Sequence, residues 1–188
     1  MKGRSMDIDK VVAAGIRVVV LDVDGVLTDG GIYVGATEAG EPVELKRFHV
    51  EDGLGVKMLQ KAGIHVAIVS GRVSAATARR ASELGVEDVH QDGGAKKLPI
   101  VRDLMTTRGV DWPHVAIIGD DLADLPVLRK AGLPATVANG VAEVRKAATW
   151  QSTRRGGEGA VREFAEALLS ARGEWDGLVD RYCRDRSG

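Results

Sequence analysis

The sequence predicts an α/β fold in which a mainly parallel sheet lies between layers of helices. Three apolar runs rich in Val and Ile indicate buried parallel strands, because such strands are covered on both faces. Each run stops at small or acidic residues, in VVVLDVDG at 18–25, HVAIVSGR at 65–72 and VAIIGDD at 115–121. Helical patterns separate the runs, and this alternation is typical of a Rossmann-like sheet built from βαβ units.

The ends of the predicted elements are marked by capping residues. Asp7 is expected to cap the first helix, and a glycine follows most of the helices. Residues 31–49 carry Tyr, Val and Phe around a turn with Gly and Pro, which predicts a β-hairpin. In chain order, the predicted elements are a helix ending at Gly15, a strand over 17–22, the hairpin, a helix over 52–62, a strand over 64–69, a helix over 74–84, a strand over 86–90, a helix over 97–108, a strand over 115–118, a helix over 122–131, a strand over 135–138, and helices over 141–147 and 160–171.

Length and composition favour one domain over residues 1–188. A chain of 188 residues, 44% of them hydrophobic, can bury one sizeable core. We place that core at about 7–171 and expect the polar tail, about 172–188, to be mobile.

Charge and cysteine content narrow the class of protein. A formal net charge of -1 argues against nucleic acid or an anionic membrane as the main partner. No run approaches the roughly 20 apolar residues of a membrane span, and no signal-peptide pattern opens the chain. The single cysteine, Cys183, fits a reducing compartment, so we expect a cytoplasmic protein.

The aspartates after the first strand predict covalent phosphoryl chemistry. The carboxyl ends of parallel strands meet at one edge of a sheet, and ligands bind at that edge. Asp22, at the end of a buried strand, can be held rigidly and attack phosphorus as a nucleophile. Asp24, two residues on in a turn that contains Gly25, can protonate the leaving oxygen and later activate water.

The same edge predicts a magnesium site. Asp22, Asp24, Asp120 and Asp121 would repel one another and bind protons unless a cation lay among them. Mg²⁺ is the natural choice, because it favours a few carboxylates together with water and substrate phosphate oxygens.

Other groups at this edge suit a phosphate. Ser70 and the backbone N–H of Gly71 lie near a helix start, where phosphate oxygens bind well, although Ser70 could equally cap that helix. A lysine supplies positive charge, and of Lys96 and Lys97 we favour Lys97. For Asp124, the alternative to a role in the site is that it lies in the first turn of its own helix and simply stabilises the helix dipole.

The motifs resemble those of a known family. LDVDGVLTDG, VSGR, Lys97 and GDDLADLP, in this order, look like the four motifs of the haloacid dehalogenase superfamily of aspartate-nucleophile phosphatases. The segments ELKRFHVEDGLG and GGEGAVREF resemble, more closely, its phosphatases of 3-deoxy-octulosonate and sialic-acid phosphates. The resemblance implies Asp22 as nucleophile and Asp24 as acid and base. It further implies Mg²⁺ held by Asp22, the main-chain carbonyl of Asp24 and Asp120, phosphate bound by Ser70, Gly71 and Lys97, and supporting roles for Asp121 and Asp124.

The spacing of the motifs leaves no room for a cap domain. Only the hairpin fits after the first motif, and only one helix and one strand fit between Arg72 and Lys97. The resemblance therefore implies a homotetramer with shared active sites, in which neighbours cover each open site. It also implies that Gly156 and Gly157 contact substrate in an adjacent site, while the residues alone fit a flexible loop before a helix equally well.

The substrate is the least determined part. The resemblance implies a sugar-acid phosphate such as 3-deoxy-D-manno-octulosonate 8-phosphate, with a nonulosonate 9-phosphate or another phosphate ester as alternatives. Glu51 and Glu158 stand where similar proteins often carry arginine, which could bind the substrate carboxylate. The candidates to bind that carboxylate in place of the missing arginine are Arg72, Arg154 and Arg155. Arg72 is our predicted substrate-binding residue.

A signalling receiver module is the alternative from another class. Such modules also gather aspartates and a lysine at the carboxyl edge of a parallel sheet. They place a lone phosphorylated aspartate mid-chain, whereas this chain has Ser70 there and its acidic pair late. The order of the motifs favours the hydrolase.

Overall fold

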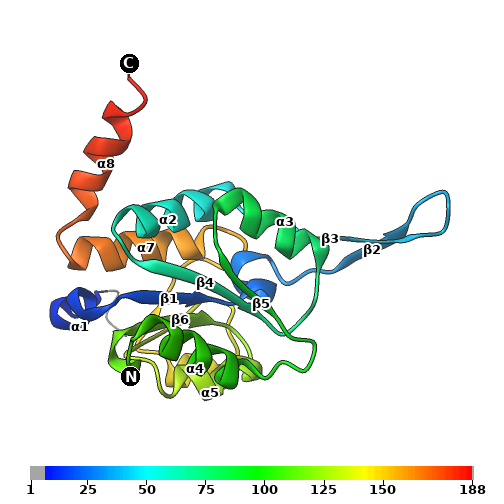
Figure 1. The fold of residues 1–188 in the computed structure, drawn as a ribbon, viewed down its shortest axis with the longest axis horizontal. Helices are drawn as coiled ribbons and strands as arrows, with labels where there is room; N and C mark the ends of the chain where they lie inside the picture. The colour runs from blue at the N-terminus through cyan, green and yellow to red at the C-terminus, as the bar shows by residue number, and fades with distance from the viewer. Residues whose placement is uncertain (1–6, 188) are drawn as a thin grey trace.

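The first apolar run forms the centre of the sheet. In the computed structural model, which describes residues 7–187, β1 (Val18–Leu21) pairs in parallel with β4 (His65–Ser70) on one side and with β6 (Val115–Gly119) on the other (Figure 1). The order across the six-stranded sheet is β5 (Asp88–Gln91), β4, β1, β6, β7 (Leu133–Thr136) and β8 (Trp150–Gln151). The strand order therefore reverses beside β1, and ligands bind at such a point in open parallel sheets.

Helices cover both faces of the sheet, as the sequence predicts (Figure 1). Alternate residues of β1 divide between the two cores: Val19 and Leu21 belong to one, and Val18 and Val20 belong to the other. The first core lies under α2 (Val50–Lys61), α3 (Ala75–Leu84) and α7 (Ala160–Ala171), and the second under α4 (Lys97–Arg108), α5 (Leu125–Leu128) and α6 (Ala142–Ala147).

Two contacts fix α7 against α2. Gly55 lets the helices approach closely, since a Cβ there would lie only 2.9 Å from the Cα of Arg162. The buried Asp52 Oδ1 accepts a hydrogen bond of 2.8 Å from the backbone N–H of Arg162, in the first turn of α7. These contacts also fix the position of the loop before α7.

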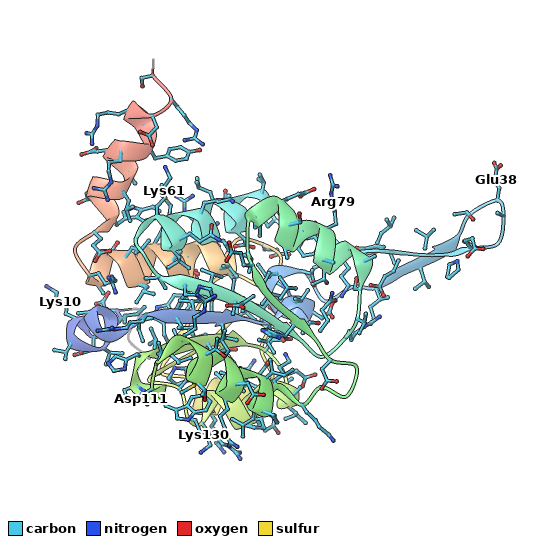
Figure 2. All side chains as sticks on the ribbon, viewed as in Figure 1. Lys10, Glu38, Lys61, Arg79, Asp111 and Lys130 are labelled. Atoms are coloured by element: carbon cyan, nitrogen blue, oxygen red, sulfur yellow. The ribbon has the colours of Figure 1, made fainter. Side chains whose placement is uncertain are left out.

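The predicted hairpin is present and projects from the body of the molecule. β2 (Tyr33–Ala36) pairs in antiparallel fashion with β3 (Pro42–Leu45), and Glu38 lies at the tip (Figure 2). Within residues 7–187, the elements between β1 and α2 are this hairpin and η1 (Val23–Leu27), a short helical turn whose backbone is non-helical at Asp24 and Gly25. No cap domain interrupts this part of the chain, as the spacing predicts.

The prediction of a mobile tail is wrong for most of its length. The structure has a helix there, α8 (Trp175–Arg184), which extends from the end of α7 (Figure 1). Leu178 is buried, and Trp175 and Tyr182 pack against the same core, so residues three and four positions apart form one apolar face. This helix was not predicted because its apolar face is narrow and the rest of the tail is polar or charged.

Smaller differences concern the ends of elements. Asp9 rather than Asp7 caps α1 (Lys10–Gly15), because its Oδ1 accepts from the N–H groups of Val11 and Val12. The helix predicted over 122–131 is instead η3 (Leu122–Asp124) followed by the short α5. The strand predicted over 135–138 is β7, which begins earlier. The structure also contains η2 (Trp112–His114), which precedes β6, and the strand β8, which was not predicted.

Two expectations concern the chain as a whole. None of the helices in residues 7–187 combines the length and apolar character needed to cross a membrane. The single-domain boundaries stay a prediction, and residues 1–6 and 188, which that domain includes, lie outside the described residues.

Candidate active site

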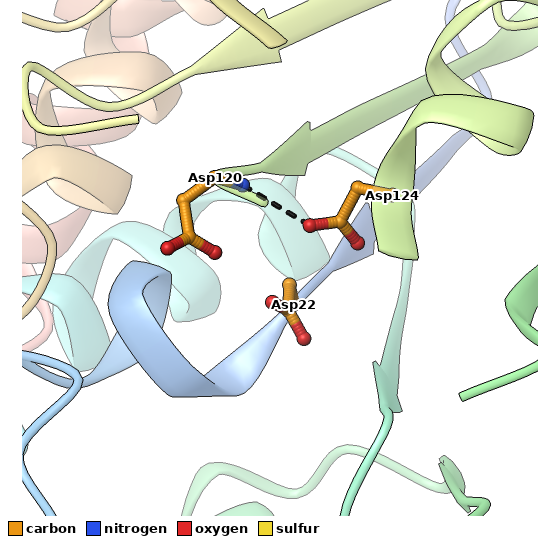
Figure 3. Close-up of side chains that lie close together, drawn as sticks. All are labelled: Asp22, Asp120 and Asp124. Carbon is orange, nitrogen blue, oxygen red and sulfur yellow. Dashed lines mark hydrogen bonds between the residues drawn. The ribbon is translucent and has the colours of Figure 1, made fainter. Parts of the chain in front are cut away.

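Three carboxylates converge where β1 and β6 end. Asp22 follows β1 and is 6% exposed, Asp120 follows β6, and Asp124 ends η3 (Figure 3). One oxygen from each lies within 4.8 Å of the other two. The backbone N–H of Asp22 donates to the carbonyl of Ile118 at 3.1 Å. The pairing of β1 with β6 therefore fixes how Asp22 and Asp120 lie relative to each other.

Gly25 allows the turn after β1 to close against Asp120. Its φ of 91° lies in the left-handed region that favours glycine. A Cβ at this position would lie 2.1 Å from Asp120 Oδ2. Any other residue would therefore push the two aspartate-bearing segments apart.

Lys97 is the cation inside this cluster. Its Nζ lies 2.6 Å from Asp22 Oδ1 and 2.6 Å from Asp124 Oδ1, and its side chain is 4% exposed. Lys96, the neighbour that the sequence left as an alternative, is exposed. The structure therefore brings Lys97, rather than Lys96, to the carboxylates.

Electrostatics show that the cluster holds an excess of negative charge. Burial and the neighbouring Asp124 raise the pKa of Asp22 to about 6, although Lys97 acts against the rise. Burial together with Asp22 and Asp124 raises the pKa of Asp120 to about 8. Burial disfavours the Lys97 ammonium, but Asp22 and Asp124 outweigh it and raise the pKa of Lys97. One ammonium does not neutralise three carboxylates.

A divalent cation fits these residues. Among the side-chain atoms that the structure describes, Asp120 Oδ1 is buried without a hydrogen-bond partner. A buried carboxylate oxygen of this kind needs a compensating charge, and carboxylate oxygens are the ligands that Mg²⁺ prefers. The donor set therefore suits a hard cation.

Asp124, rather than Asp121, completes the described cluster. Asp124 Oδ2 accepts from the backbone N–H of Asp120 at 3.1 Å, which holds its carboxylate in place (Figure 3). The Asp121 carboxylate caps η3, since its Oδ1 accepts from the N–H of Leu122 at 2.7 Å. A ligand role for Asp121 stays a prediction.

Asp24 belongs to a second group, which the hairpin completes. Its Oδ1 lies 2.5 Å from Nζ of Lys46, and the Lys46 side chain is 0% exposed. Lys46 follows β3. Sequence reasoning missed this lysine, although it lies within the segment ELKRFHVEDGLG that carries part of the family resemblance.

The turn after β4 lies beside the same edge. Ser70 is buried, and its Oγ accepts from the N–H of Arg72 at 3.2 Å. Gly71 lies near Lys97, because a Cβ there would lie 3.9 Å from Lys97 Cε. Arg72 Nη2 lies 2.7 Å from Glu44 Oε2, so the hairpin holds the predicted substrate-binding arginine. The phosphate roles of Ser70 and Gly71 stay predictions.

Gly156 and Gly157 pack against the turn after β1 of their own chain. The N–H of Gly157 donates to the carbonyl of Val26 at 3.0 Å. A Cβ on Gly156 would lie 1.7 Å from the carbonyl oxygen of Gly25, so backbone meets backbone here. Their predicted contact with substrate stays untested.

Glu51, one of the two departures from the family pattern, has a partner. Its Oε2 lies 2.5 Å from Arg154 Nη1, and the hydrogen bond from Arg154 lowers the pKa of Glu51. Glu158, the other departure, is exposed. Arg154 therefore offsets the charge that Glu51 would otherwise present.

Comparisons with known proteins show the family to which the chain belongs. A model of the haloacid dehalogenase-like hydrolases matches residues 91–164. The 3-deoxy-D-manno-octulosonate 8-phosphate phosphatase KdsC of Escherichia coli K12 is 41% identical over 164 residues, which are 87% of this chain and 85% of the relative. This chain belongs to that family of haloacid dehalogenase-like phosphatases. The KdsC of Yersinia pestis is 40% identical over 167 residues, 89% of this chain and 87% of the relative.

Solved structures of the family share the fold. The 3-deoxy-D-manno-octulosonate 8-phosphate phosphatase of Moraxella catarrhalis, in complex with magnesium, phosphate and KDO, has a TM-score of 0.85 at 39% identity and covers 92% of this chain and 97% of its own. The cobalt-bound form of the Haemophilus influenzae phosphatase has a TM-score of 0.79 at 40% identity, over 86% of this chain and 92% of its own. The predictions of the family and of its fold from the four motifs are thereby confirmed.

Proposed function

We propose that this protein is a magnesium-dependent phosphomonoesterase that forms an aspartyl-phosphate intermediate and hydrolyses 3-deoxy-D-manno-octulosonate 8-phosphate. The observation that carries the proposal is the buried Asp22 carboxylate, held by Lys97 within a carboxylate cluster at the end of β1. The relatives named for this substrate, which match most of the chain, support its assignment.

Magnesium would be held by Asp22, Asp120 and the main-chain carbonyl of Asp24. When bound, Mg²⁺ would stabilise the charge on the phosphoryl oxygens. Asp124 would hold Lys97 in place through their 2.6 Å ion pair. Asp121, predicted from the sequence as a further ligand, lies next to Asp120 in the chain.

In the first half-reaction Asp22 is the nucleophile. One carboxylate oxygen of Asp22 attacks phosphorus, and the bond between phosphorus and the sugar oxygen breaks. Asp24 donates a proton to that leaving oxygen, so the sugar departs as an alcohol. Lys97 balances the negative charge gathered around Asp22, and Ser70 and Gly71 bind the phosphoryl group.

In the second half-reaction Asp24 is the base. Its carboxylate takes a proton from a water molecule, whose oxygen attacks the phosphorus of the aspartyl phosphate. The bond between phosphorus and Asp22 breaks, and inorganic phosphate leaves. Both aspartates return to their starting states, so the cycle balances without another reactant.

The sugar-acid carboxylate requires a cation near the mouth of the site. Arg72 and Arg154 are each paired with a glutamate of this chain, Glu44 and Glu51. Arg155 is exposed and forms no ion pair among the described residues, so of the three candidates it could act without first leaving such a pair. A nonulosonate 9-phosphate would present the same two anionic groups and remains the second candidate.

Phosphate release from a panel of esters tests this function. We expect the highest kcat/KM for 3-deoxy-D-manno-octulosonate 8-phosphate, less for a nonulosonate 9-phosphate, and least for glucose 6-phosphate. A chelator should abolish turnover and Mg²⁺ should restore it. Asp22→Asn should reduce turnover by at least about 10⁴-fold, because an amide cannot replace the nucleophile.

The matched control is Asp111→Asn, an exposed change at the far side of the molecule (Figure 2). It should leave every rate unchanged. Substantial activity in Asp22→Asn, or full activity without metal, would contradict the mechanism. A preference for another ester would contradict only the substrate.

We also propose that the protein is a cytoplasmic homotetramer with shared active sites. An open site admits water, which weakens electrostatic stabilisation of the transition state. The hairpin exposes large apolar side chains, and such patches mark interaction surfaces. These side chains are Ile32, Tyr33, Val34 and Leu45, of which Val34 is 78% exposed.

A further inference from the structure

Lys46 is a buried cation that the proposed mechanism does not use. Its side chain is 0% exposed, and its Nζ lies 2.5 Å from Asp24 Oδ1 and 3.9 Å from Glu44 Oε1. A lysine buried in a protein needs a charged partner, because an unpaired buried ammonium is costly. The position of the Lys46 ammonium is therefore coupled to that of the Asp24 carboxylate.

A line of alternating charges continues from this pair to the next loop of the site. Glu44 lies on β3, and its Oε2 is 2.7 Å from Nη2 of Arg72. Arg72 follows Ser70, the last residue of β4. The hairpin thus joins the turn after β1 to the turn after β4 through Asp24, Lys46, Glu44 and Arg72.

Exposure distinguishes the two members of the pair. The Asp24 side chain is 24% exposed, whereas that of Lys46 is fully covered. Asp24 can therefore reach a bound ester, while Lys46 lies beneath the surface and acts through the residues it contacts, of which Asp24 is nearer than Glu44. A general acid must lie within hydrogen-bond reach of the atom it protonates, and misplacement by about 1 Å can cost about 10²-fold in rate.

We infer that Lys46 is a positioning residue, which holds the Asp24 carboxyl group where it can protonate the leaving oxygen. The inference rests on the proposed function, since it assigns Lys46 to the acid of that mechanism. It predicts that the importance of Lys46 depends on the leaving group. A sugar alkoxide is strongly basic and needs the proton, whereas 4-nitrophenolate is weakly basic and leaves without it.

The test compares Lys46→Met with the wild type on two esters. The measured quantity is kcat/KM, which reports the steps up to formation of the aspartyl phosphate. For 3-deoxy-D-manno-octulosonate 8-phosphate we expect a fall of about 10- to 100-fold. For 4-nitrophenyl phosphate we expect a change of less than about threefold, because general-acid catalysis contributes little there.

Three further variants complete the design. Lys46→Arg, which keeps the positive charge, should restore most of the rate on the sugar-acid ester. Arg47→Met is the control, since Arg47 is the exposed neighbour of Lys46 and pairs with Asp29 instead; it should leave both rates unchanged. Lys46→Gln carries the same expectation as Lys46→Met and replaces it if that variant does not fold.

Combining Lys46→Met with Asp24→Asn shows whether Lys46 affects the rate through Asp24. Adding Lys46→Met to Asp24→Asn should cause no further loss on the sugar-acid ester, because the group that Lys46 positions is already gone. Equal losses on both esters, or a further loss in this background, would overturn the inference. A wild type that hydrolyses neither ester with Mg²⁺ would instead overturn the proposed function.

Discussion

Asp22 and Asp24 stand two residues apart, and each pairs with a lysine, yet the two pairs belong to different parts of the molecule. The lysine of Asp22 is Lys97, at the start of α4, and both side chains are almost fully buried. The lysine of Asp24 is Lys46, just after the hairpin, and Asp24 is partly exposed. We call these the sheet half and the hairpin half of the site.

The difference separates two chemical tasks. In the proposed mechanism, the sheet half gathers the nucleophile, the cation site and Lys97, which act on a phosphoryl group that all phosphomonoesters share. The hairpin half holds Asp24, which in the same mechanism acts on the leaving oxygen and so faces the part of the substrate that varies. A rigid sheet edge suits the constant task, and a projecting arm suits the variable one.

Among the changes that test this comparison, the largest effect is expected at Gly156, which packs on Gly25 where the two halves meet. In Gly156→Ala the new Cβ would lie 1.7 Å from the Gly25 carbonyl oxygen, so the turn that follows Asp24 must shift. We expect activity to fall by about 100-fold or more, and the free energy of unfolding to fall by about 1–3 kcal/mol. Steady-state kinetics and thermal unfolding measure the two effects.

Gly93→Ala is the matched control for this change. A Cβ on Gly93 meets nothing within 4 Å, and its effect on the free energy of unfolding should stay within about 0.5 kcal/mol. If Gly156→Ala were fully active, the halves would not depend on the packing of this turn.

A smaller effect should be confined to the sheet half. Without metal, the pKa of Asp22 is raised to about 6 and that of Asp120 to about 8, so both carry protons at low pH and Mg²⁺ must displace them. Affinity for Mg²⁺ should therefore rise between pH 6 and pH 8, by up to about tenfold per pH unit. Calorimetric titration at several pH values measures it.

Lys46→Met tests whether this behaviour belongs to the sheet half alone. The variant should show the same rise in Mg²⁺ affinity as the wild type, since Lys46 contacts neither Asp22 nor Asp120 directly in the described ion pairs. An affinity that does not change with pH would mean that the carboxylates hold no protons to displace.

The smallest effect on the chemistry of a single subunit is expected at the hairpin strand itself. Val34→Asp should split the proposed tetramer into smaller species, because it places a charge in the exposed apolar patch. The free energy of unfolding of the subunit should change by no more than about 0.5 kcal/mol. Light scattering measures the mass, and Glu38→Ala, a change of a polar residue at the hairpin tip, is the control (Figure 2). A wild type that is already monomeric would contradict the proposed assembly.

The sheet half was the predictable part. Asp22 and Asp120 follow apolar strands, and parallel pairing brings the ends of such strands together. The sequence favoured Lys97 but could not exclude Lys96, because the choice depends on which of the two side chains points inward at the start of α4. The capping role of Asp121 likewise depends on backbone geometry that the motif does not encode.

The hairpin half was not predictable in the same way. Lys46 and Asp24 lie 22 positions apart, and their contact depends on how the arm leaves the sheet. No periodic pattern reports such a contact. The helix α8 was missed for a related reason: its few apolar residues can be recognised as one buried face only once the core that they pack against is known.

The contact of Gly157 with Val26 joins a turn near the start of the chain to a segment near its end. A ribosome that has made only the first strands and helices has therefore made all three clustered carboxylates and their lysine, but not the segment that packs behind the turn. Because this segment packs directly on the turn that follows Asp24, we expect the aspartates to reach their final arrangement only after α7 has emerged and docked on α2. Hydrolysis would then begin only once synthesis has passed α7.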